Sequence, residues 1–380
     1  MDEMQVPLSS PDITEEEIQA VVDVMRTRHL SLGPKGPEFE RAFCHYLGVE
    51  HAIAMSSGTA GLHASLLALG IGPGDEVITT PFSFIASANV ILMAGAKPVF
   101  ADIDPKSLNI DVAKAERAFT PATKAILGVE AFGNPAGMHD VAQLAARHEI
   151  PFVEDCCEAL GSVHKRRRAG TFGRCGVFGF YPNKQITTGE GGMVVTNDAK
   201  LADLCRSFRN QGRDPGGNWL AHTRLGYNYR LSDINCALGI VQMRRLEEIL
   251  TKRQRVAHTY VRHLLDSPHV ILPTIDEDTT MSWFVFVVRL SDAFTAADRD
   301  AIIGYLRSRG IGSSNYFPPI HLQPFYAEKF GFKRGDFPIT EYVSDRTLAL
   351  PFHNNLTETD VEAVVHHLNA AIALRLEQRA

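Results

Sequence analysis

Short apolar runs rich in β-branched residues alternate with segments of helical period between residues 50 and 200. Apolar runs of this length, bounded by turn residues, predict strands. The predicted strands cover residues 51–55, 76–80, 98–101, 125–130, 151–154, 177–180 and 193–196. Because strands that alternate with helices form a mostly parallel sheet covered on both faces, this pattern predicts an α/β domain.

Apolar positions at helical spacing predict the helices. Leu62, Leu66 and Leu69 fall on one face of a helix over residues 60–69, directly after a Ser-Gly-Thr turn. Further helices are predicted over residues 15–26, 37–47, 296–309 and 357–377, with Gly48 as the stop of the second. A long helix is predicted from residue 235 to about residue 264, where it would link two domains.

The length of the chain predicts two unequal domains. At 380 residues it exceeds the ~250–300 residues at which single cores stop growing. We assign residues 1–250 to a large domain with an N-terminal helical segment, and residues 251–380 to a smaller C-terminal α+β domain. A strand over residues 282–290 would belong to the smaller domain.

Composition narrows the class of protein. With 45% hydrophobic and 22% charged residues the chain is globular. A net charge of -6 argues against nucleic acid as a partner. The basic run at residues 165–168 is interpreted as a solvated turn, with a contact to an anionic ligand as the alternative. The six cysteines lack any Cys-x-x-Cys spacing and predict reduced, mostly buried thiols. Without a run of ~18 apolar residues, we expect no membrane association and a cytoplasmic location.

Lys184 lies between an apolar strand and a Gly-Glu-Gly-Gly turn at residues 189–192. Upstream, the strand at residues 151–154 leads into Asp155, at the edge where open α/β sheets bind ligands. A lysine can hold pyridoxal 5'-phosphate as a Schiff base, and an aspartate can keep its pyridine nitrogen protonated. Asp155 alone is also typical of a helix N-cap, and the Ser-Gly-Thr turn could be a phosphate site or an ordinary cap.

Other cofactor classes find no support in the motifs. No Gly-x-Gly-x-x-Gly follows a strand, and Gly-Pro-Lys-Gly at residues 33–36 lacks the end of a P-loop. The fifteen histidines show no cluster with the spacing of a metal site.

Six motifs, taken in chain order, resemble those of the DegT/DnrJ/EryC1/StrS aminotransferases. They are Ser-Gly-Thr-Ala at residues 57–60, Gly-Asp-Glu-Val-Ile-Thr-Thr-Pro-Phe-Ser-Phe at 74–84, Glu-Asp at 154–155, Tyr-Pro-Asn-Lys at 181–184, Gly-Glu-Gly-Gly at 189–192 and Gly-Tyr-Asn-Tyr-Arg at 226–230. The resemblance runs from about Leu8 to His367. It implies a fold-type I transferase with a mostly parallel seven-stranded sheet in the large domain and a smaller C-terminal domain.

The resemblance also implies roles for residues of the cofactor site. Lys184 would bind pyridoxal phosphate covalently, and Asp155 would pair with its pyridinium nitrogen. Phe84 would stack on the ring. Ser57 and the backbone of Gly58 and Thr59 would hold the phosphate.

Asn228 would reach that phosphate from the other subunit of a homodimer with shared active sites.

Three positions depart from the commonest pattern of the family. Gly179 replaces a frequent serine, Glu158 a frequent glutamine beside the phenolic oxygen, and Glu130 a frequent histidine. Because relatives that dehydrate sugars carry histidine in place of the lysine, Lys184 favours amino transfer.

Members of the family mostly aminate keto groups of nucleotide-linked sugars, with glutamate or glutamine as donor. Cationic side chains in segments that would flank the cofactor are candidate substrate contacts, although each could be a solvated surface charge. They are Arg28, His29, Lys35, Arg213, Arg224 and Arg230. Tyr316 and His321 resemble a loop that lines the substrate cavity, and His321 could equally be a packed turn residue. The alternatives in function are a keto-cyclitol aminotransferase and a non-catalytic regulatory protein on the same scaffold.

Overall fold

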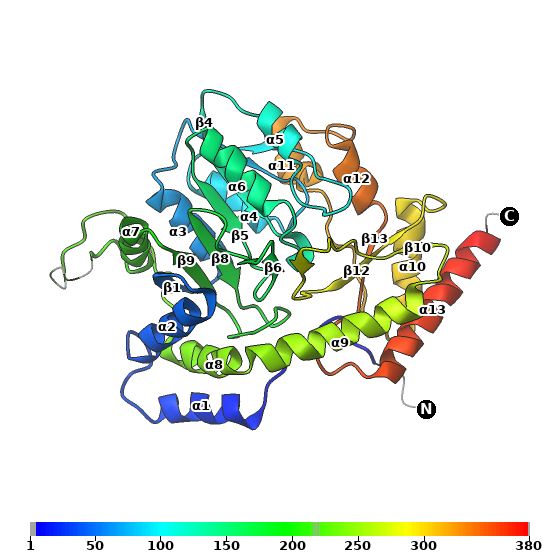
Figure 1. The fold of residues 1–380 in the computed structure, drawn as a ribbon, viewed down its shortest axis with the longest axis horizontal. Coiled ribbons are helices and arrows are strands. Elements are labelled where there is room, and N and C mark those ends of the chain that lie inside the picture. The colour runs from blue at the N-terminus through cyan, green and yellow to red at the C-terminus, as the bar shows by residue number, and fades with distance from the viewer. Residues whose placement is uncertain (1–4, 215, 217, 219, 379–380) are drawn as a thin grey trace.

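A seven-stranded sheet forms the centre of the computed structural model, which describes residues 5–214, 216, 218 and 220–378 (Figure 1). Its strands, in spatial order, are β1 (His51–Met55), β9 (Gly192–Thr196), β8 (Cys175–Gly179), β5 (Phe152–Asp155), β4 (Thr123–Val129), β2 (Glu76–Thr79) and β3 (Lys97–Phe100). Only β9 runs antiparallel to its neighbours. The predicted mostly parallel sheet is therefore confirmed, and the seven predicted strands match with small shifts at their ends.

Helices cover both faces of this sheet, which explains why its strands are mostly apolar and buried. Alternate residues of a strand point to opposite faces. In β1, Ile53 packs with α3 (Gly58–Ala68), α4 (Ala86–Met93) and α7 (Ala199–Arg209), whereas Ala52 and Ala54 pack with α2 (Lys35–Leu47) and α8 (Asp233–Arg244). Two further helices, α5 (Val112–Arg117) and α6 (Met138–Arg147), cover β4 and β5 on the side of Ile126 and Phe152.

The single long helix predicted from residue 235 to residue 264 is wrong, because the chain forms two helices there. Helix α8 ends at Arg244, and α9 (Leu246–Leu264) follows. Arg245 between them departs from α-helical backbone geometry, with φ −90° and ψ 3°. The guanidinium of Arg245 bonds to Asp12 and to the buried Glu17 of α1 (Glu15–Met25), both at 2.7–2.8 Å. This anchor holds Arg245 at the break, and α1 packs along α8 (Figure 1).

The C-terminal part has its own small sheet and core. Strands β10 (Val270–Ile271), β12 (Phe286–Leu290) and β13 (Thr347–Leu350) pack with α10 (Ala296–Ser308) and α13 (Glu358–Glu377). Two short helices, α11 (Pro324–Phe330) and α12 (Pro338–Ser344), connect back toward the large sheet. The N-terminal Val6 also packs in this core. The division of the chain at residue 250 stays a prediction.

The strand predicted over residues 282–290 is shorter than expected. It begins at Phe286, because Trp283 adopts the left-handed backbone with φ 56° and residues 282–284 bend out of the strand. Just before this bend, β11 (Thr279–Thr280) pairs with β6 (Val163–His164), which in turn pairs with β7 (Arg167–Arg168).

Within the basic run at residues 165–168, Lys165 and Arg166 form the tight turn between β6 and β7 with φ 47° and 64°, and the other two residues are β7 itself. All six cysteines are free thiols and four of them are buried, as predicted. Across the described part of the chain, none of the helices combines the length and apolar character needed to cross a bilayer.

Candidate active site

The carboxyl ends of the parallel strands meet at one edge of the sheet, the place where open α/β sheets bind ligands. The segments that follow β1, β2, β5 and β8 surround a cavity of about 660 Å³ there. Its lining includes most of the predicted cofactor residues, namely Ser57, Gly58, Thr59, Phe84, Asp155, Glu158 and Lys184. A volume of this size suits a cofactor together with a small substrate.

Lys184 follows β8 in a turn. Its backbone N–H donates to the carbonyl of Tyr181 at 2.9 Å. Its side chain is 14% exposed, and the Nζ atom lies 3.6 Å from Oε1 of Glu158. The same Nζ atom lies 3.9 Å from the centroid of the Phe284 ring. The amine therefore rests between a carboxylate and an aromatic face.

Glu158 is buried, and its Oε2 atom accepts a hydrogen bond from the backbone N–H of Phe132 at 2.8 Å. Burial raises the pKa of Glu158, and the nearby Lys184 amine and the Phe132 N–H oppose that shift. The departure from glutamine at this position thus places an ionisable group beside the catalytic lysine candidate.

Asp155 ends β5 and is 6% exposed. Its Oδ2 atom accepts from the Ser87 hydroxyl at 2.7 Å, and its Oδ1 atom accepts from the Cys157 N–H at 3.2 Å. No helix starts between Asp155 and β6, so the N-cap interpretation of Asp155 is wrong. The carboxylate is held by two donors at the cavity wall, where it can bind a protonated ring nitrogen.

The start of α3 forms an anion cradle. The Ser57 hydroxyl accepts from the Ala60 N–H at 3.0 Å, so Ser57 is the N-cap. The N–H groups of Gly58 and Thr59 have no partner within a helix, and the positive end of the helix dipole lies there. A Cβ atom on Gly192 would lie 2.5 Å from the Ser57 carbonyl carbon, so the glycine turn packs directly against this backbone.

These residues fit pyridoxal phosphate. The cradle suits its phosphate, Asp155 its ring nitrogen, and Lys184 its aldehyde. Phe84 is 62% exposed and lines the cavity, so its ring face is available for stacking.

Several predicted residues lie outside this cavity. Asn228, Arg28 and His29 are exposed, and Lys35 pairs with Glu38 at 2.8 Å. The set outside the lining consists of Asn228, Arg28, His29, Lys35, Arg213, Arg224 and Arg230. Arg224 pairs with Asp214, and Arg230 donates to Asn210 at 3.0 Å. None of these contacts involves the cavity of the same chain.

The two loop candidates separate. Tyr316 lines the cavity, as predicted. His321 does not, because it is fully buried and its Nε2 atom lies 3.0 Å from Oε1 of Glu341. Burial lowers the pKa of His321. The structure therefore supports the packed turn residue and not the substrate contact.

The lining residues that sequence reasoning missed include Ser87, Cys157, Phe284 and Asn315. Ser87 carries a weak signal, since it follows Phe84 by one helical turn in an otherwise apolar run. Phe284 carries none, because an aromatic residue in a strand-like run usually belongs to a core.

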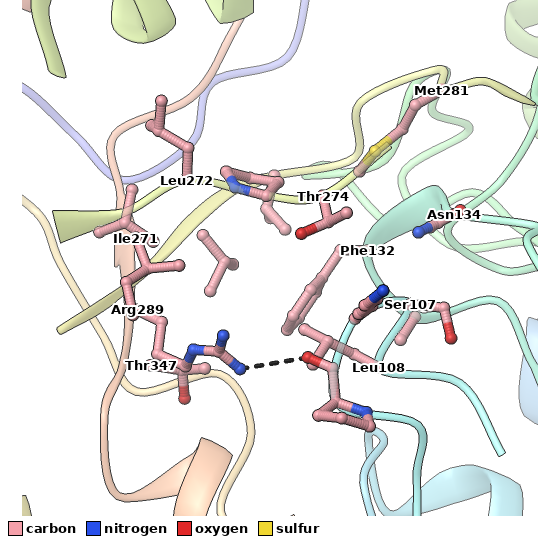
Figure 2. Close-up of a pocket in the computed structure, with 17 residues that line it drawn as sticks. Ser107, Leu108, Phe132, Asn134, Ile271, Leu272, Thr274, Met281, Arg289 and Thr347 are labelled. Carbon is pink, nitrogen blue, oxygen red and sulfur yellow. Dashed lines mark hydrogen bonds between the residues drawn. The ribbon is translucent and has the colours of Figure 1, made fainter. Parts of the chain in front are cut away.

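A second cavity, of about 50 Å³, lies between the loop at residues 105–108 and the small sheet (Figure 2). Figure 2 shows Leu108, Phe132, Ile271 and Met281 around it, and Arg289 donates to the carbonyl of Pro105 at 3.2 Å. Such a space is far below the ~300 Å³ of a typical ligand pocket, so it is a packing gap between the two sheets.

The fold also gathers side chains that are distant in the sequence. Glu130, Glu154 and Cys156 are buried, and one potential metal-ligand atom of each lies within 4.8 Å of those of the other two. Glu154 accepts from the N–H groups of Gly170 at 2.9 Å and Gly173 at 2.5 Å, whereas both oxygens of Glu130 are buried beside Glu154 and Cys156. Spacing along the chain did not reveal this cluster.

Together, a mostly parallel sheet, a helix N-terminus suited to phosphate and a lysine–aspartate pair at the strand ends define a fold-type I transferase. The model of the DegT/DnrJ/EryC1/StrS aminotransferase family matches residues 11–369. The chain belongs to this family and is an aminotransferase.

Similar proteins agree with this assignment. GDP-perosamine synthase of Caulobacter vibrioides is 38% identical over 375 residues, which cover 97% of this chain and 98% of that protein. The structure of Helicobacter pylori PseC, an aminotransferase involved in the biosynthesis of pseudoaminic acid, has a TM-score of 0.91 and 30% identity, with 97% and 99% of the two chains covered. The PLP-form of Spr1654 from Streptococcus pneumoniae has a TM-score of 0.92 and 27% identity, with 97% and 98% covered.

Proposed function

We propose that this protein uses pyridoxal phosphate to transfer an amino group from glutamate or glutamine to a nucleotide-linked keto sugar. The observation that supports this most directly is the single cavity that gathers Lys184, Asp155 and the Ser57–Thr59 cradle. The names of GDP-perosamine synthase and of PseC support a sugar as the acceptor.

In this proposal the cofactor, when bound, supplies an electron sink for the carbon that loses its proton. Lys184 would hold the cofactor covalently, and its amine, when free, would take the proton from the α-carbon of the donor. Asp155 would keep a proton on the ring nitrogen, and the start of α3 would bind the phosphate. Phe84 would cover the ring and exclude water.

A second subunit would complete the site. The carboxylates of the donor and the diphosphate of the acceptor need cations, and Lys184 is the one cationic side chain among the described residues of the lining. Phe84 at 62% and Tyr181 at 53% exposure leave the cavity mouth uncovered. We therefore propose a homodimer in which Asn228 reaches the partner's phosphate site, and in which Arg28, His29, Lys35, Arg224 and Arg230 are candidate substrate contacts.

Borohydride reduction tests the cofactor site. The purified protein is expected to show a visible absorbance that reduction converts into a covalent label on Lys184, located by peptide mass spectrometry. Lys124, which is exposed on β4, serves as the control lysine. A label on any lysine other than Lys184 would overturn the site assignment.

A panel of acceptors tests the substrate class. With glutamate as donor, release of 2-oxoglutarate is expected with nucleotide-linked 3-keto or 4-keto sugars. Turnover with a keto-cyclitol alone would replace the sugar by the cyclitol. Absence of turnover with both, in a protein without visible absorbance, would support a non-catalytic role instead.

A further inference from the structure

The segment Ser282, Trp283 and Phe284 brings an aromatic ring over Lys184. Phe284 is 2% exposed, lines the cavity and presents its ring 3.9 Å from the Lys184 Nζ atom. A cation within about 6 Å of a ring centroid is attracted by the ring face. The Oε1 atom of Glu158 lies 3.6 Å from the same Nζ atom. The carboxylate and the ring together therefore define one position for the Lys184 amine.

The backbone of this segment is held in an unusual conformation. Trp283 has φ 56°, a region that bulky residues rarely adopt, so its surroundings must impose it. From helix α9, Arg253 donates to the carbonyl of Trp283 at 2.6 Å and to the carbonyl of Phe284 at 2.7 Å. The neighbouring Gln254 accepts from the indole N–H of Trp283 at 3.0 Å.

Arg253 is buried, with only 3% exposed, and forms no ion pair with a carboxylate among the described residues. Burial lowers the pKa of Arg253 and only the charge of Asp12 opposes this, so its hydrogen bonds must compensate for the cost of burial. Two of them go to the carbonyls beside Phe284, and a third goes to Oδ1 of Asn354 at 3.1 Å. The Arg253 guanidinium thus stabilises the bend at Trp283 and Phe284 through these hydrogen bonds.

The other side of the bend is tied to the lysine turn. Gln185, the residue after Lys184, donates to the Ser282 hydroxyl at 2.8 Å and to the carbonyl of Glu158 at 2.5 Å. Stacked rings continue from Phe284 through Tyr316 and Phe317 to Phe132. The N–H of Phe132 then holds Glu158, so the contacts form a closed loop around the amine.

We propose that Phe284 and Glu158 form a seat for the Lys184 amine whenever that amine is not covalently bound, and that Arg253 is the positioning residue that fixes Phe284. This inference rests on the proposed role of Lys184. The seat keeps the amine at the point from which it exchanges the proton of the donor, instead of letting the flexible lysine chain sample the cavity.

Nuclear magnetic resonance can detect the seat without any turnover. Lysines of the full-length protein, freed of cofactor, are reductively methylated with ¹³C-formaldehyde, and the Lys184 signal is identified by its absence in Lys184→Arg. An amine over a ring face is shifted upfield by the ring current. We expect this shift to disappear in Phe284→Leu and to persist in Phe284→Tyr, which keeps the ring. An unchanged Lys184 signal in Phe284→Leu would overturn the proposal.

Arg253 is tested against its neighbour on the same helix. Arg255 donates to the carbonyls of Asn354 and Leu356 at 3.3 and 3.4 Å, away from the bend. We expect Arg253→Met to move the Lys184 signal, Arg253→Lys to move it less, and Arg255→Met to leave it in place. If Arg253→Met does not fold, Arg253→Lys carries the comparison. A folded Arg253 variant with an unmoved Lys184 signal would remove Arg253 from the proposal.

Kinetics of the cofactor-loaded enzyme give an independent readout. Phe284→Leu is expected to lower kcat about tenfold with little change in the KM of the donor, the size that a cation–π contact of a desolvated amine supports. Borohydride mapping in the same variants separates the two levels of the argument. A label on a lysine other than Lys184 refutes the proposed function, whereas a label on Lys184 with no ring-current shift refutes only the seat.

Discussion

Asp155 is the side chain whose charge the proposed chemistry needs most directly. Asp155→Asn keeps the shape and removes the charge that would stabilise a protonated ring nitrogen. We expect kcat to fall by about 10²–10³-fold, the loss typical when one group aimed at developing charge is removed. The measurement is steady-state turnover with the cofactor saturating, so that weaker cofactor binding does not enter.

Ser87 supplies the matched comparison, because it donates to Asp155 without carrying charge. Ser87→Ala removes one hydrogen bond to a carboxylate, worth ~1.5 kcal/mol, and should lower kcat by only about tenfold. Equal losses in the two variants would show that Asp155 acts through its position alone and not through its charge.

Glu130 and Glu154 make stability depend on pH. Burial, and then the charge of Glu154, raises the pKa of Glu130 well above its usual range. Burial also raises the pKa of Glu154, to about 7, although the Gly173 N–H opposes this. A raised pKa means that the folded protein holds the proton more tightly than the unfolded chain. The stabilisation is complete below the ordinary carboxyl pKa of about 4.3 and is lost as the pH rises through about 7.

Glu130→Gln should therefore flatten this dependence, because the amide cannot ionise beside Glu154. We expect the fall in the free energy of unfolding between pH 5.5 and pH 8.5 to shrink by roughly 1–3 kcal/mol. Urea unfolding at the two pH values measures it. Glu149→Gln, on an exposed turn, is the control and should leave the wild-type dependence intact. A Glu130→Gln protein as pH-sensitive as the wild type would show that ionisation of Glu130 does not contribute to the pH dependence.

At the scale of elements, β9 sets the position of the phosphate cradle through Gly192. A Cβ atom there would lie 2.5 Å from the Ser57 carbonyl carbon and 2.7 Å from the Gly58 nitrogen, both of them backbone atoms that cannot rotate away. Overpacking of this kind costs ~1–3 kcal/mol, so Gly192→Ala should weaken cofactor binding about tenfold or more.

Titration of the cofactor-free protein, followed by absorbance, gives the dissociation constant. Gly36→Ala is the control, because no atom lies within 4 Å of the added Cβ. Wild-type affinity in Gly192→Ala would show that the start of α3 is not where the phosphate binds.

The elements that sequence reasoning placed correctly are those with a strong local pattern. The seven strands of the large sheet are short, mostly apolar runs, and Gly48 ends α2 with φ 72°, as a helix-stopping glycine should. The failures have long-range causes. The break at Arg245 depends on ion pairs with Asp12 and Glu17, and the late start of β12 depends on Arg253. The periodicity of hydrophobic residues along the chain contains no information about partners that are distant in the sequence.

At the scale of the whole molecule, shared active sites predict complementation between inactive subunits. Lys184→Ala and Asn228→Ala proteins should each lose activity, the second only in part. If Asn228 serves the partner's site, a mixed dimer contains one site with both residues intact. Turnover should therefore rise after the two variants are mixed and allowed to exchange subunits.

The control pairs two residues of the same cavity. Lys184 and Asp155 line the cavity of one chain, so every site in a mixed dimer of Lys184→Ala and Asp155→Asn lacks one of them. This mixture should stay inactive. Absence of complementation with Asn228→Ala would argue that each subunit builds its site alone. Complementation by the Lys184 and Asp155 variants would contradict the placement of both residues in the site of one chain.

The sequence by itself determined the α/β class and the strand positions, and it singled out Lys184, Asp155 and the Ser57–Thr59 turn as candidates for the site. These follow from hydrophobic period and from motifs, which are local properties of the chain. Only the tertiary structure decided that His321 is packed against Glu341, that Glu130 faces Glu154, and that Phe284 covers Lys184. Such contacts join segments far apart in the sequence, and burial and charge at them arise only when those segments pack together.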